Sequence, residues 1–592
     1  MHRYLIRCFD HVCYSGVQCG FQFQDACLQR KVQIQMANMT GAQFMAETIK
    51  SYGVDHIFFT PAVLYQVLAE FEKLGGTPVM AHSEKAAAYM ADGYARVRNA
   101  PSVAFGQSVG AANLAAGLQD AFLALAPVVA VTGRRQPGWR QRHSYQEIDH
   151  RAAYDAVTKF NAEVETQGEL PMLLRQAFRE AVSGATAPTH LDLPGISGTD
   201  LMGPGDDFEV IPEPRFNSMP PFRAHPDPSD IADVAKLLSE AERPAIIAGG
   251  GVTTSGAAVE LRQLIEKLKV PMAFALNAKG QVPDNHPLNI GMVGSYSRSS
   301  ANKFIREADF VLYIGSRTGS QVTNDWKNPS VSQGVKVAQI DSNGEELGRN
   351  YPNAASVLGD ARESLKALIS AVDTVGQRDE WLGRVAKIEA EWAAEYEQYL
   401  VSDAIPMRPE RVCKEISDAL PDDGIVVVDT GHNAMWAGMY LDINKPGQRF
   451  LRCAGSLGWA FPAAIGAKYG AGDRPVVCFT GDGGLWYHFT ELETAVSQNL
   501  PFVTVINDNR SFNQTQGGVR RAFADNAGDG DNVWKFTDVD FAAVAQEMGA
   551  VGMRVDRPDE LAGAIKEALA SDRPVIIDAK TDPDALAPLP WG

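Results

Sequence analysis

The sequence has no apolar run long enough to span a membrane, and it is poor in positive charge and in cysteine. Its 54 lysines and arginines face 72 aspartates and glutamates, which gives a net charge of -18 at pH 7. Such an excess of negative charge argues against nucleic acid or an anionic membrane as the partner. The seven cysteines in 592 residues form no zinc-binding pattern. They therefore indicate a reduced compartment and predict a cytoplasmic protein.

What the sequence has in quantity is apolar residues, which make up 45% of the chain and can fill several cores. From Thr40 onward, helical patterns alternate with short apolar strands, which is typical of doubly wound parallel sheets. We predict an α/β fold with three such domains. The predicted divisions are an unstructured or dispensable extension at 1–36, domains at 37–202, 230–375 and 406–592, a proline-rich linker at 203–229, and a connecting helix on the surface at 376–405.

Asp482 and Asn509 stand at the ends of two successive predicted strands, 475–480 and 502–506. Between them, the Thr-x-x-Glu pattern at 490–493 predicts a capping box that begins a helix. Ligands bind at the carboxyl ends of parallel strands, and magnesium that holds a diphosphate takes one or two oxygen ligands from protein. We therefore predict a metal-diphosphate clamp. For Gly-Asp-Gly alone, an ordinary turn is the alternative.

This motif resembles the diphosphate-magnesium motif of thiamine diphosphate enzymes, and the resemblance covers roughly residues 38 to 585. It implies an aminopyrimidine-binding N-terminal domain and a diphosphate-binding C-terminal domain. The metal ligands that it implies are Asp482, Asn509 and the backbone carbonyl of Ser511, and the residues that it places beside the diphosphate are Gly483, Gly484, His432 and Asn433. A lone histidine in a turn is more often solvated than functional, which is the alternative for His432.

Two further segments carry the resemblance. In the segment 82–96, Glu84 matches the family glutamate that activates the cofactor through the aminopyrimidine ring. The segment 455–466 is similar to the one that bends the cofactor, with Leu457 as the wedge and Gly455 allowing close approach. A solvated glutamate at a helix start and a buried core leucine are the alternatives.

Within the family, the chain resembles the acetolactate synthases, because Gln146 matches the glutamine near the substrate. The acceptor pocket is expected to differ, since Pro61–Leu64 replaces the glycine-rich loop and the family arginine and tryptophan fall on Gln321 and Gly518. In place of the usual Thr-Ser-Gly-Pro-Gly loop, Gln107 brings an amide toward the substrate. The alternative for Gln107 is a structural hydrogen bond.

Neutral polar residues at 513–516 are expected to line the same pocket from the other domain. Amides stabilise an oxyanion but transfer protons poorly, so we expect proton transfer from the cofactor amine, from water or from a histidine such as His82. The predicted reaction is a thiamine diphosphate- and Mg²⁺-dependent cleavage or ligation of a C–C bond next to a carbonyl, in a 2-oxo acid or dicarbonyl.

Three alternatives remain open on the sequence. The first is a simple 2-oxo acid decarboxylase. The second is a flavin-dependent oxidase of the pyruvate oxidase type, with FAD held by segments that resemble 291–294 and 315–317. The third is a relative that binds cofactor without turnover, which the retained Glu84 and Asp482 disfavour. The resemblance also implies a small-molecule substrate and a homo-oligomer, dimer or tetramer, with the active site at the subunit interface.

Overall fold

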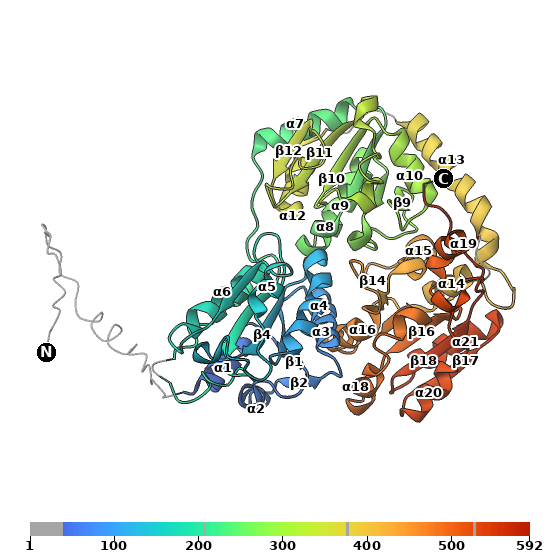
Figure 1. Cartoon of the computed structure of the whole chain (residues 1–592). Helices are drawn as coiled ribbons and strands as arrows, with labels where there is room; N and C mark the ends of the chain where they lie inside the picture. The colour runs from blue at the N-terminus through green and yellow to red at the C-terminus, as the bar shows by residue number, and fades with distance from the viewer. Residues whose placement is uncertain (1–38, 206–207, 374–377, 525–527, 592) are drawn as a thin grey trace, which may run out of the picture.

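The predicted extension at 1–36 lies outside the residues that the computed structural model describes, which are 39–205, 208–373, 378–524 and 528–591. Figure 1 shows three units, each with a six-stranded sheet and helices packed on its faces. Every strand pair in the three sheets is parallel. The predicted fold class is therefore confirmed, whereas the domain limits stay predictions.

The N-terminal sheet has the order β2-β1-β3-β4-β6-β5. Its strands are β1 (His56–Phe59), β2 (Thr77–Met80), β3 (Ser102–Gly106), β4 (Val128–Arg134), β5 (Phe160–Glu163) and β6 (Thr189–Pro194). Its helices are α1 (Gly41–Ser51), α2 (Tyr65–Lys73), α3 (Glu84–Arg98), α4 (Gly110–Ala124), α5 (His150–Asp155) and α6 (Leu170–Val182). Strands β3 and β4 are buried throughout, which explains their nearly continuous apolar sequences.

The C-terminal sheet repeats this order as β14-β13-β15-β16-β18-β17. Its strands are β13 (Ile425–Val428), β14 (Arg449–Arg452), β15 (Val476–Gly481), β16 (Val503–Asp508), β17 (Val551–Val555) and β18 (Val575–Lys580). Its helices are α14 (Pro409–Ala419), α15 (Gly431–Tyr440), α16 (Ala460–Ala471), α17 (Asp482–Leu485), α18 (Glu491–Ser497), α19 (Gln516–Ala522), α20 (Phe541–Glu547) and α21 (Pro558–Leu569). The strand order reverses between β13 and β15, so a crevice opens at their carboxyl ends.

The central sheet has a different order, β12-β11-β10-β7-β8-β9, which is shared by nucleotide-binding sheets. Its strands are β7 (Pro244–Ala248), β8 (Met272–Phe274), β9 (Asn289–Met292), β10 (Phe310–Ile314), β11 (Lys336–Asp341) and β12 (Ala355–Leu358). Its helices are α7 (Pro228–Glu240), α8 (Gly250–Ser255), α9 (Ala258–Leu268), α10 (Ser299–Glu307), α11 (Ser320–Thr323) and α12 (Ala361–Ala371). The order reverses between β7 and β10, each of which ends at a glycine-rich turn.

The first and third domains pack through α3 and α16, which lie side by side in Figure 1. Glycines set the close approach of these helices. A Cβ atom on Gly93 would lie 2.1 Å from the carbonyl oxygen of Ala463, and one on Gly466 would lie 1.8 Å from that of Met90. One apolar core therefore runs through both domains.

Two local predictions need correction. The capping box at 490–493 does not form: Thr490 has helical dihedral angles and its side chain caps nothing, because α17 and a turn already lead the chain into α18. The connecting helix is α13 (Asp379–Leu400), but it is not only a surface helix, since it buries Trp381, Val385 and Ile388. Among all the helices described, none has both the length and the apolar character needed to cross a membrane.

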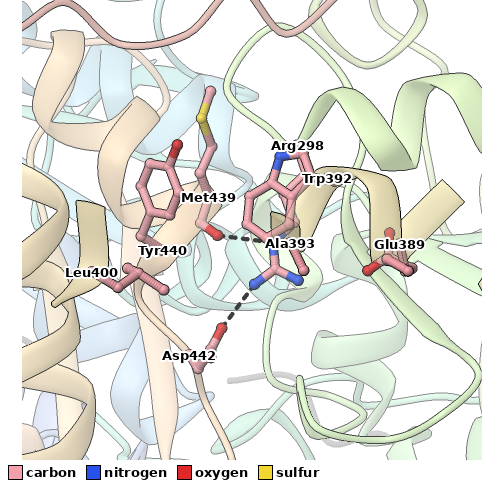
Figure 2. Close-up of a pocket in the computed structure, with 9 residues that line it drawn as sticks. Arg298, Glu389, Trp392, Ala393, Leu400, Met439, Tyr440 and Asp442 are labelled. Atoms are coloured by element: carbon pink, nitrogen blue, oxygen red, sulfur yellow. Dashed lines mark hydrogen bonds and ion pairs between the residues drawn. The ribbon is translucent and has the colours of Figure 1, made fainter. Parts of the chain in front are cut away.

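Arg298 joins the central domain to the C-terminal one (Figure 2). Its Nε donates to the carbonyl oxygen of Met439 at 2.8 Å and its Nη2 donates to Asp442 at 2.9 Å. The guanidinium lies 4.6 Å from the ring centre of Trp392 on α13. A pocket of about 370 Å³ lies beside this joint. The contacts fix the carboxyl end of α15, the helix that begins at the C-terminal crevice.

Candidate active site

The predicted metal ligands meet at the carboxyl ends of β15 and β16. Asp482 and Asn509 are only 2% and 5% exposed. Ser511 bridges them, because its N–H donates to Asp482 Oδ2 at 2.9 Å and its Oγ donates to Asn509 Oδ1 at 2.8 Å. Within the described residues, no donor bonds to the Ser511 carbonyl oxygen. A carboxylate, an amide oxygen and a carbonyl oxygen suit Mg²⁺, which prefers hard oxygen ligands.

Electrostatics favour a cation at the same place. Burial raises the pKa of Asp482 well above its usual range, and the nearby Asp508 raises it further. Asp508 is itself paired with Lys580. A bound cation would lower the pKa of Asp482 again, because it stabilises the ionised carboxylate. In the part of the chain that the structure describes, no cluster of three or more histidines, cysteines or acidic residues suits a metal, so any metal here depends on a mixed donor set.

The glycines after β15 leave no room for a side chain. A Cβ on Gly483 would lie 2.7 Å from the ring of Phe512, and one on Gly484 would lie 3.0 Å from Asp429 Oδ2. Only glycine fits at these two positions, because Phe512 and Asp429 pack directly against the backbone of the turn. The roles of Gly483 and Gly484 toward a diphosphate stay predictions.

Asp429, at the end of β13, was not among the predicted site residues. It is 1% exposed, and its carboxylate accepts bonds from the N–H groups of Gly458 at 3.1 Å and Ala460 at 3.3 Å. Burial raises its pKa to about 6. These bonds fix the start of α16 against the end of β13. An acidic residue directly after an apolar strand was the sequence signal for it.

The segment at 455–466 is also held from the N-terminal domain. Asp120 on α4 accepts bonds from the N–H groups of Ala454, Gly455 and Ser456 at 2.9, 3.0 and 2.9 Å. Gly455 is exposed with open space where its Cβ would point, and Leu457 is half-buried. The predicted wedge therefore sits on a backbone that is anchored from both domains. A buried aspartate in the apolar helix α4 was the signal that sequence reasoning missed.

His432 and Asn433 begin α15 at the same crevice. His432 Nδ1 lies 2.5 Å from the Oδ1 atom of Asn513, whose Nδ2 donates to the carbonyl oxygen of Pro583. Because that amide oxygen can only accept, Nδ1 of His432 carries the proton, and burial lowers the pKa of the ring. Asn433 donates to the carbonyl oxygen of Phe479, and its own Oδ1 has no partner among the described residues. Asn433 thus braces β15 in this structure, and its contact with a diphosphate stays a prediction.

Glu84 is the first residue of α3 and is half-buried. Its Oε1 accepts from Thr60 at 2.6 Å and its Oε2 accepts from Asn113 at 3.1 Å. A Cβ on Gly110 would lie 2.4 Å from Oε1. The carboxylate is therefore held at the carboxyl edge of the N-terminal sheet by partners from its own domain. The structure does not bring it into hydrogen-bond contact with the Asp482 group within one chain.

The two predicted substrate glutamines lie on loops that touch each other. Gln107 follows β3 and is half-buried, and no described group bonds to its side chain. Ser108 donates to the carbonyl oxygen of Gln146, and Gln146 Nε2 donates to the Tyr145 hydroxyl at 3.2 Å. Gln146 has a φ of 57°, a left-handed conformation that is uncommon for its type and recurs at functional loops. Their catalytic roles stay predictions.

His82 does not lie free for proton transfer. Its backbone N–H donates to the Glu491 carboxylate at 3.1 Å, its Nδ1 lies 3.2 Å from Thr494 Oγ1, and its Nε2 lies 3.2 Å from Glu493. His82 instead links the N-terminal domain to α18. Both ring nitrogens have partners in this structure, and a role of His82 in proton transfer stays a prediction.

The glycine-rich turns of the central domain border a cavity of about 720 Å³. Gly249–Gly251 follow β7 and Gly315–Arg317 follow β10, and the two turns cross closely, since a Cβ on Gly249 would lie 2.3 Å from the Gly315 carbonyl oxygen. Residues from all three domains line the cavity. The other predicted flavin segment, 291–294, is not part of its lining.

Comparisons with known proteins agree with this geometry. Three family models match the chain: the N-terminal binding domain, the central domain and the C-terminal binding domain of thiamine pyrophosphate enzymes, at residues 39–153, 231–368 and 429–579. The chain is 32% identical to the probable acetolactate synthase large subunits of Methanococcus aeolicus and Methanocaldococcus jannaschii, with 94% of each chain covered. It is 29% identical to the acetolactate synthase large subunit of Corynebacterium glutamicum, over 92% of this chain and 87% of that one.

These matches extend over all three domains and include the Gly481–Gly484 turn. The predicted family is therefore confirmed. The chain belongs to the thiamine pyrophosphate enzymes and is a thiamine pyrophosphate-dependent enzyme of the acetolactate synthase type.

Proposed function

We propose that this enzyme uses thiamine diphosphate and Mg²⁺ to cleave or join a C–C bond next to the carbonyl of a 2-oxo acid or dicarbonyl. The observation that carries the proposal is the pair Asp482 and Asn509, both buried at the carboxyl ends of the neighbouring strands β15 and β16 and bridged by Ser511. The relatives named as acetolactate synthases support the reaction class.

When bound, the cofactor supplies a nucleophilic carbon that attacks the substrate carbonyl. The protein's contribution is positional. Glu84, whose carboxylate is oriented by hydrogen bonds from Thr60 and Asn113, would be the group that exchanges a proton with the aminopyrimidine of a bound cofactor. Gln107 and Gln146 offer neutral N–H donors to the substrate oxygen, which stabilise negative charge without exchanging protons. Leu457, half-buried on the segment that Asp120 anchors, would be the wedge against which the cofactor bends.

The metal part of the proposal has its own test. Asp482→Ala removes the one carboxylate of the set, and we expect it to abolish the Mg²⁺ dependence of thiamine diphosphate binding, measured by calorimetry with and without Mg²⁺. Asp559→Asn, on the exposed side of α21, serves as the control. Wild-type affinity and Mg²⁺ dependence in the Asp482 variant would refute the clamp.

The reaction is tested by incubating the holoenzyme with a panel of 2-oxo acids and diketones while following carbon dioxide, aldehyde and hydroxyketone together. Hydroxyketone identifies a carboligase, and aldehyde alone identifies the simple decarboxylase. Tight cofactor binding with no product from any member of the panel would count against the proposal.

The central cavity favours a second candidate, in which FAD occupies this space. Its support is the cavity of about 720 Å³ between the turns Gly249–Gly251 and Gly315–Arg317, in a sheet with nucleotide-binding order. A visible flavin spectrum in the purified protein would establish the cofactor, and substrate-dependent oxygen consumption would establish an oxidase. A colourless protein that ignores added FAD would exclude both.

The working unit that we propose is a homodimer or a larger homo-oligomer with the active site between subunits. Support comes from Glu84, whose hydrogen bonds stay inside its own domain, and from the exposed Trp486 and Tyr487 beside the Asp482 turn, which are 44% and 52% exposed. A mixture of Glu84→Gln and Asp482→Ala subunits should regain up to about a quarter of wild-type activity, because half of the dimers would hold one intact site. Two inactive variants that stay inactive after subunit exchange would contradict a shared site.

The proposed compartment is the cytoplasm. In the described part of the chain, Cys413, Cys453 and Cys478 are free and buried. Burial raises the pKa of each thiol well above its usual range, so these groups stay protonated and unreactive. Thiols of this kind fit a reducing environment.

A further inference from the structure

An arginine- and tryptophan-containing loop follows β4 at the edge of the N-terminal sheet where the substrate residues lie. This loop, 135–149, comes after β4, which pairs with β3 in the register Gly106 with Thr132. Gln107 and the start of the loop therefore leave the sheet side by side. The loop holds three non-glycine residues with positive φ, namely Gln141, His143 and Gln146.

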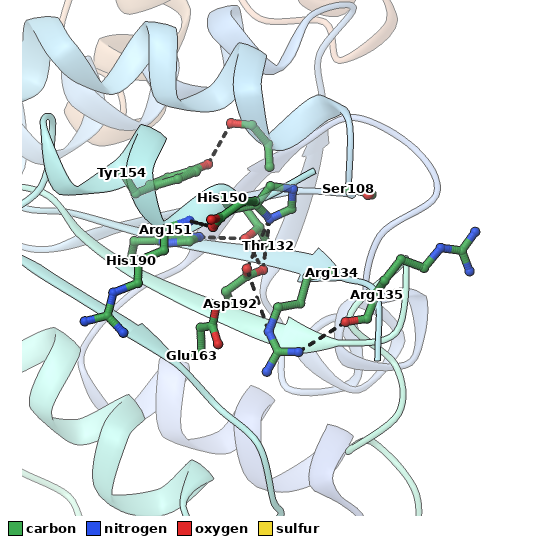
Figure 3. Close-up of polar contacts among 12 residues, drawn as sticks. Ser108, Thr132, Arg134, Arg135, His150, Arg151, Tyr154, Glu163, His190 and Asp192 are labelled. Carbon is green, nitrogen blue, oxygen red and sulfur yellow. Dashed lines mark hydrogen bonds and ion pairs between the residues drawn. The ribbon is translucent and has the colours of Figure 1, made fainter. Parts of the chain in front are cut away.

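Consecutive arginines at the end of β4 have different surroundings. Arg134 is 3% exposed and its Nη2 lies 2.9 Å from Glu165, so its charge is neutralised within the domain. Figure 3 shows Arg134 turned toward the buried cluster around Asp192 and Arg135 pointing away from it. No carboxylate in the described residues lies within ion-pair distance of Arg135. In a chain with a net charge of -18, an unpaired guanidinium at this edge needs an explanation.

Arg135 is held in place without using the part of the guanidinium that recognises anions. Its Nε donates to the Tyr145 carbonyl oxygen at 2.6 Å. Its guanidinium carbon lies 5.7 Å from the ring centre of Trp139 and 6.0 Å from that of Tyr145, and both rings are more than half exposed. Both terminal nitrogens thus remain free to donate a bidentate pair of hydrogen bonds.

A second unpaired cation lies in the same loop. Arg142 is exposed, and its single hydrogen bond is the weak one to the Gly138 carbonyl oxygen at 3.4 Å. Arg140 differs, because it pairs with Glu163 at 2.8 Å and lies 3.8 Å from Glu165. The loop therefore contains one arginine in an ion pair and two, Arg135 and Arg142, that form no ion pair with any described residue, although Glu147 of the same loop bonds to backbone N–H groups of Gln141 and Ser144.

The loop reaches the substrate residues directly. The carbonyl oxygen of Tyr145 accepts from Arg135, and the next carbonyl oxygen, that of Gln146, accepts from Ser108, the neighbour of Gln107. Arg135 and the two glutamines thus belong to one connected surface. Because β3 and β4 are neighbouring strands and Gln107 and Arg135 directly follow them, a substrate that bonds to Gln107 has Arg135 at the next strand end.

We propose that Arg135 and Arg142 form an anion subsite, so that the preferred substrate is a 2-oxo acid with a second anionic group, a carboxylate, phosphonate or sulfonate, at its far end. This inference rests on the proposed function. Arg135 supplies the bidentate contact and Arg142 adds positive charge at the mouth of the site. The aromatic rings of Trp139 and Tyr145 keep the Arg135 guanidinium oriented and partly desolvated, which strengthens its bonds to an anion.

The test compares the holoenzyme on pyruvate, which has one anionic group, with 2-oxoglutarate and phosphonopyruvate, which have two. We expect a higher kcat/KM for a doubly anionic substrate. In Arg135→Gln this preference should fall roughly tenfold to a hundredfold, the range for losing one or two charge-assisted hydrogen bonds, mainly through a higher KM for the doubly anionic substrates. Arg142→Gln should lower the preference for doubly anionic substrates less than Arg135→Gln does. Added salt should lower the preference of the wild type in the same way as Arg142→Gln, because salt screens exposed charges. Arg140→Gln, which breaks only a surface ion pair, should leave the preference unchanged.

Equal use of pyruvate and the doubly anionic substrates by the wild type would overturn the inference. So would a loss of kcat in Arg135→Gln that is the same for all substrates, because it would mean that the arginine only supports the loop. If no 2-oxo acid is turned over, the proposed function fails separately. Binding of phosphonoacetate to the holoenzyme, measured by calorimetry, then decides: binding that is lost in Arg135→Gln supports the subsite, and no binding to wild type refutes it.

Discussion

Asp120 offers the sharpest test of how the N-terminal domain controls the segment that is predicted to contact the cofactor. The carboxylate is 1% exposed and accepts three backbone N–H bonds from 454–456 at 2.9 to 3.0 Å. Asp120→Asn keeps the size of the side chain but removes the charge. It also turns an NH₂ group toward at least one N–H donor, so that two donors face each other.

The expected loss follows from the bond inventory. Hydrogen bonds to a charged group contribute about 1.5–3 kcal/mol each, and neutral ones about 1 kcal/mol. Losing one of the three bonds and weakening the other two should destabilise the anchored segment by roughly 2.5–7 kcal/mol. Since about 1.4 kcal/mol corresponds to a factor of ten, local opening of this segment should become at least roughly 60 times more frequent.

Hydrogen exchange of the amides at 454–456 measures that opening directly, and thiamine diphosphate affinity measures its consequence. We expect faster exchange confined to this segment and a weaker affinity for the cofactor. Asp559→Asn, an exposed aspartate on α21, should change neither. Unchanged exchange together with unchanged affinity in Asp120→Asn would show that the carboxylate is not what anchors the segment.

Three further outcomes are expected. Glu84→Gln should bind thiamine diphosphate nearly as well as wild type but turn over far more slowly, because the amide cannot hold the proton that activates the cofactor; equal turnover would refute its role. Gly466→Ala should sharply lower the melting temperature, because its Cβ would lie 1.8 Å from a carbonyl oxygen of α3. The control Gly563→Ala, whose Cβ would have no atom within contact distance, should stabilise α21 slightly. Similar melting temperatures for the two variants would contradict the close crossing of α3 and α16. Burial lowers the pKa of His488 to about 4 from a reference value of 6.5. The stability that His488 contributes is therefore complete above pH 6.5. It is lost as the pH falls toward 4, by about 1.4 kcal/mol per pH unit. His488→Phe should flatten the pH dependence of the unfolding free energy between pH 4 and 6.5. The control His225→Gln, which changes an exposed histidine, should leave that pH dependence unchanged. An unchanged slope in His488→Phe would show that His488 is charged in the folded state.

Much of the fold and part of the candidate site could be predicted from the sequence, because buried parallel strands have a strong signal. Continuous apolar runs such as β3, β4 and β15 indicate strands with both faces covered, and their polar ends mark the ligand edge of the sheet. The placement of Asp482 and Asn509 at the ends of two strands that are successive along the chain follows from that pattern alone. The order of the strands does not, because it depends on contacts between segments far apart in the chain.

The sequence by itself determined the three α/β domains and the polar residues at their strand ends. Only the tertiary structure decided which side chains hold the site together: Asp120 reaches a segment 335 residues later in the chain, and His82 binds Glu491, 409 residues away. It also decided that Arg134 is paired while Arg135 is free, although the two are neighbours in sequence. Local sequence patterns indicate burial and backbone conformation. A hydrogen bond or an ion pair between domains depends instead on the partner that folding brings near, and that partner cannot be identified from a local pattern.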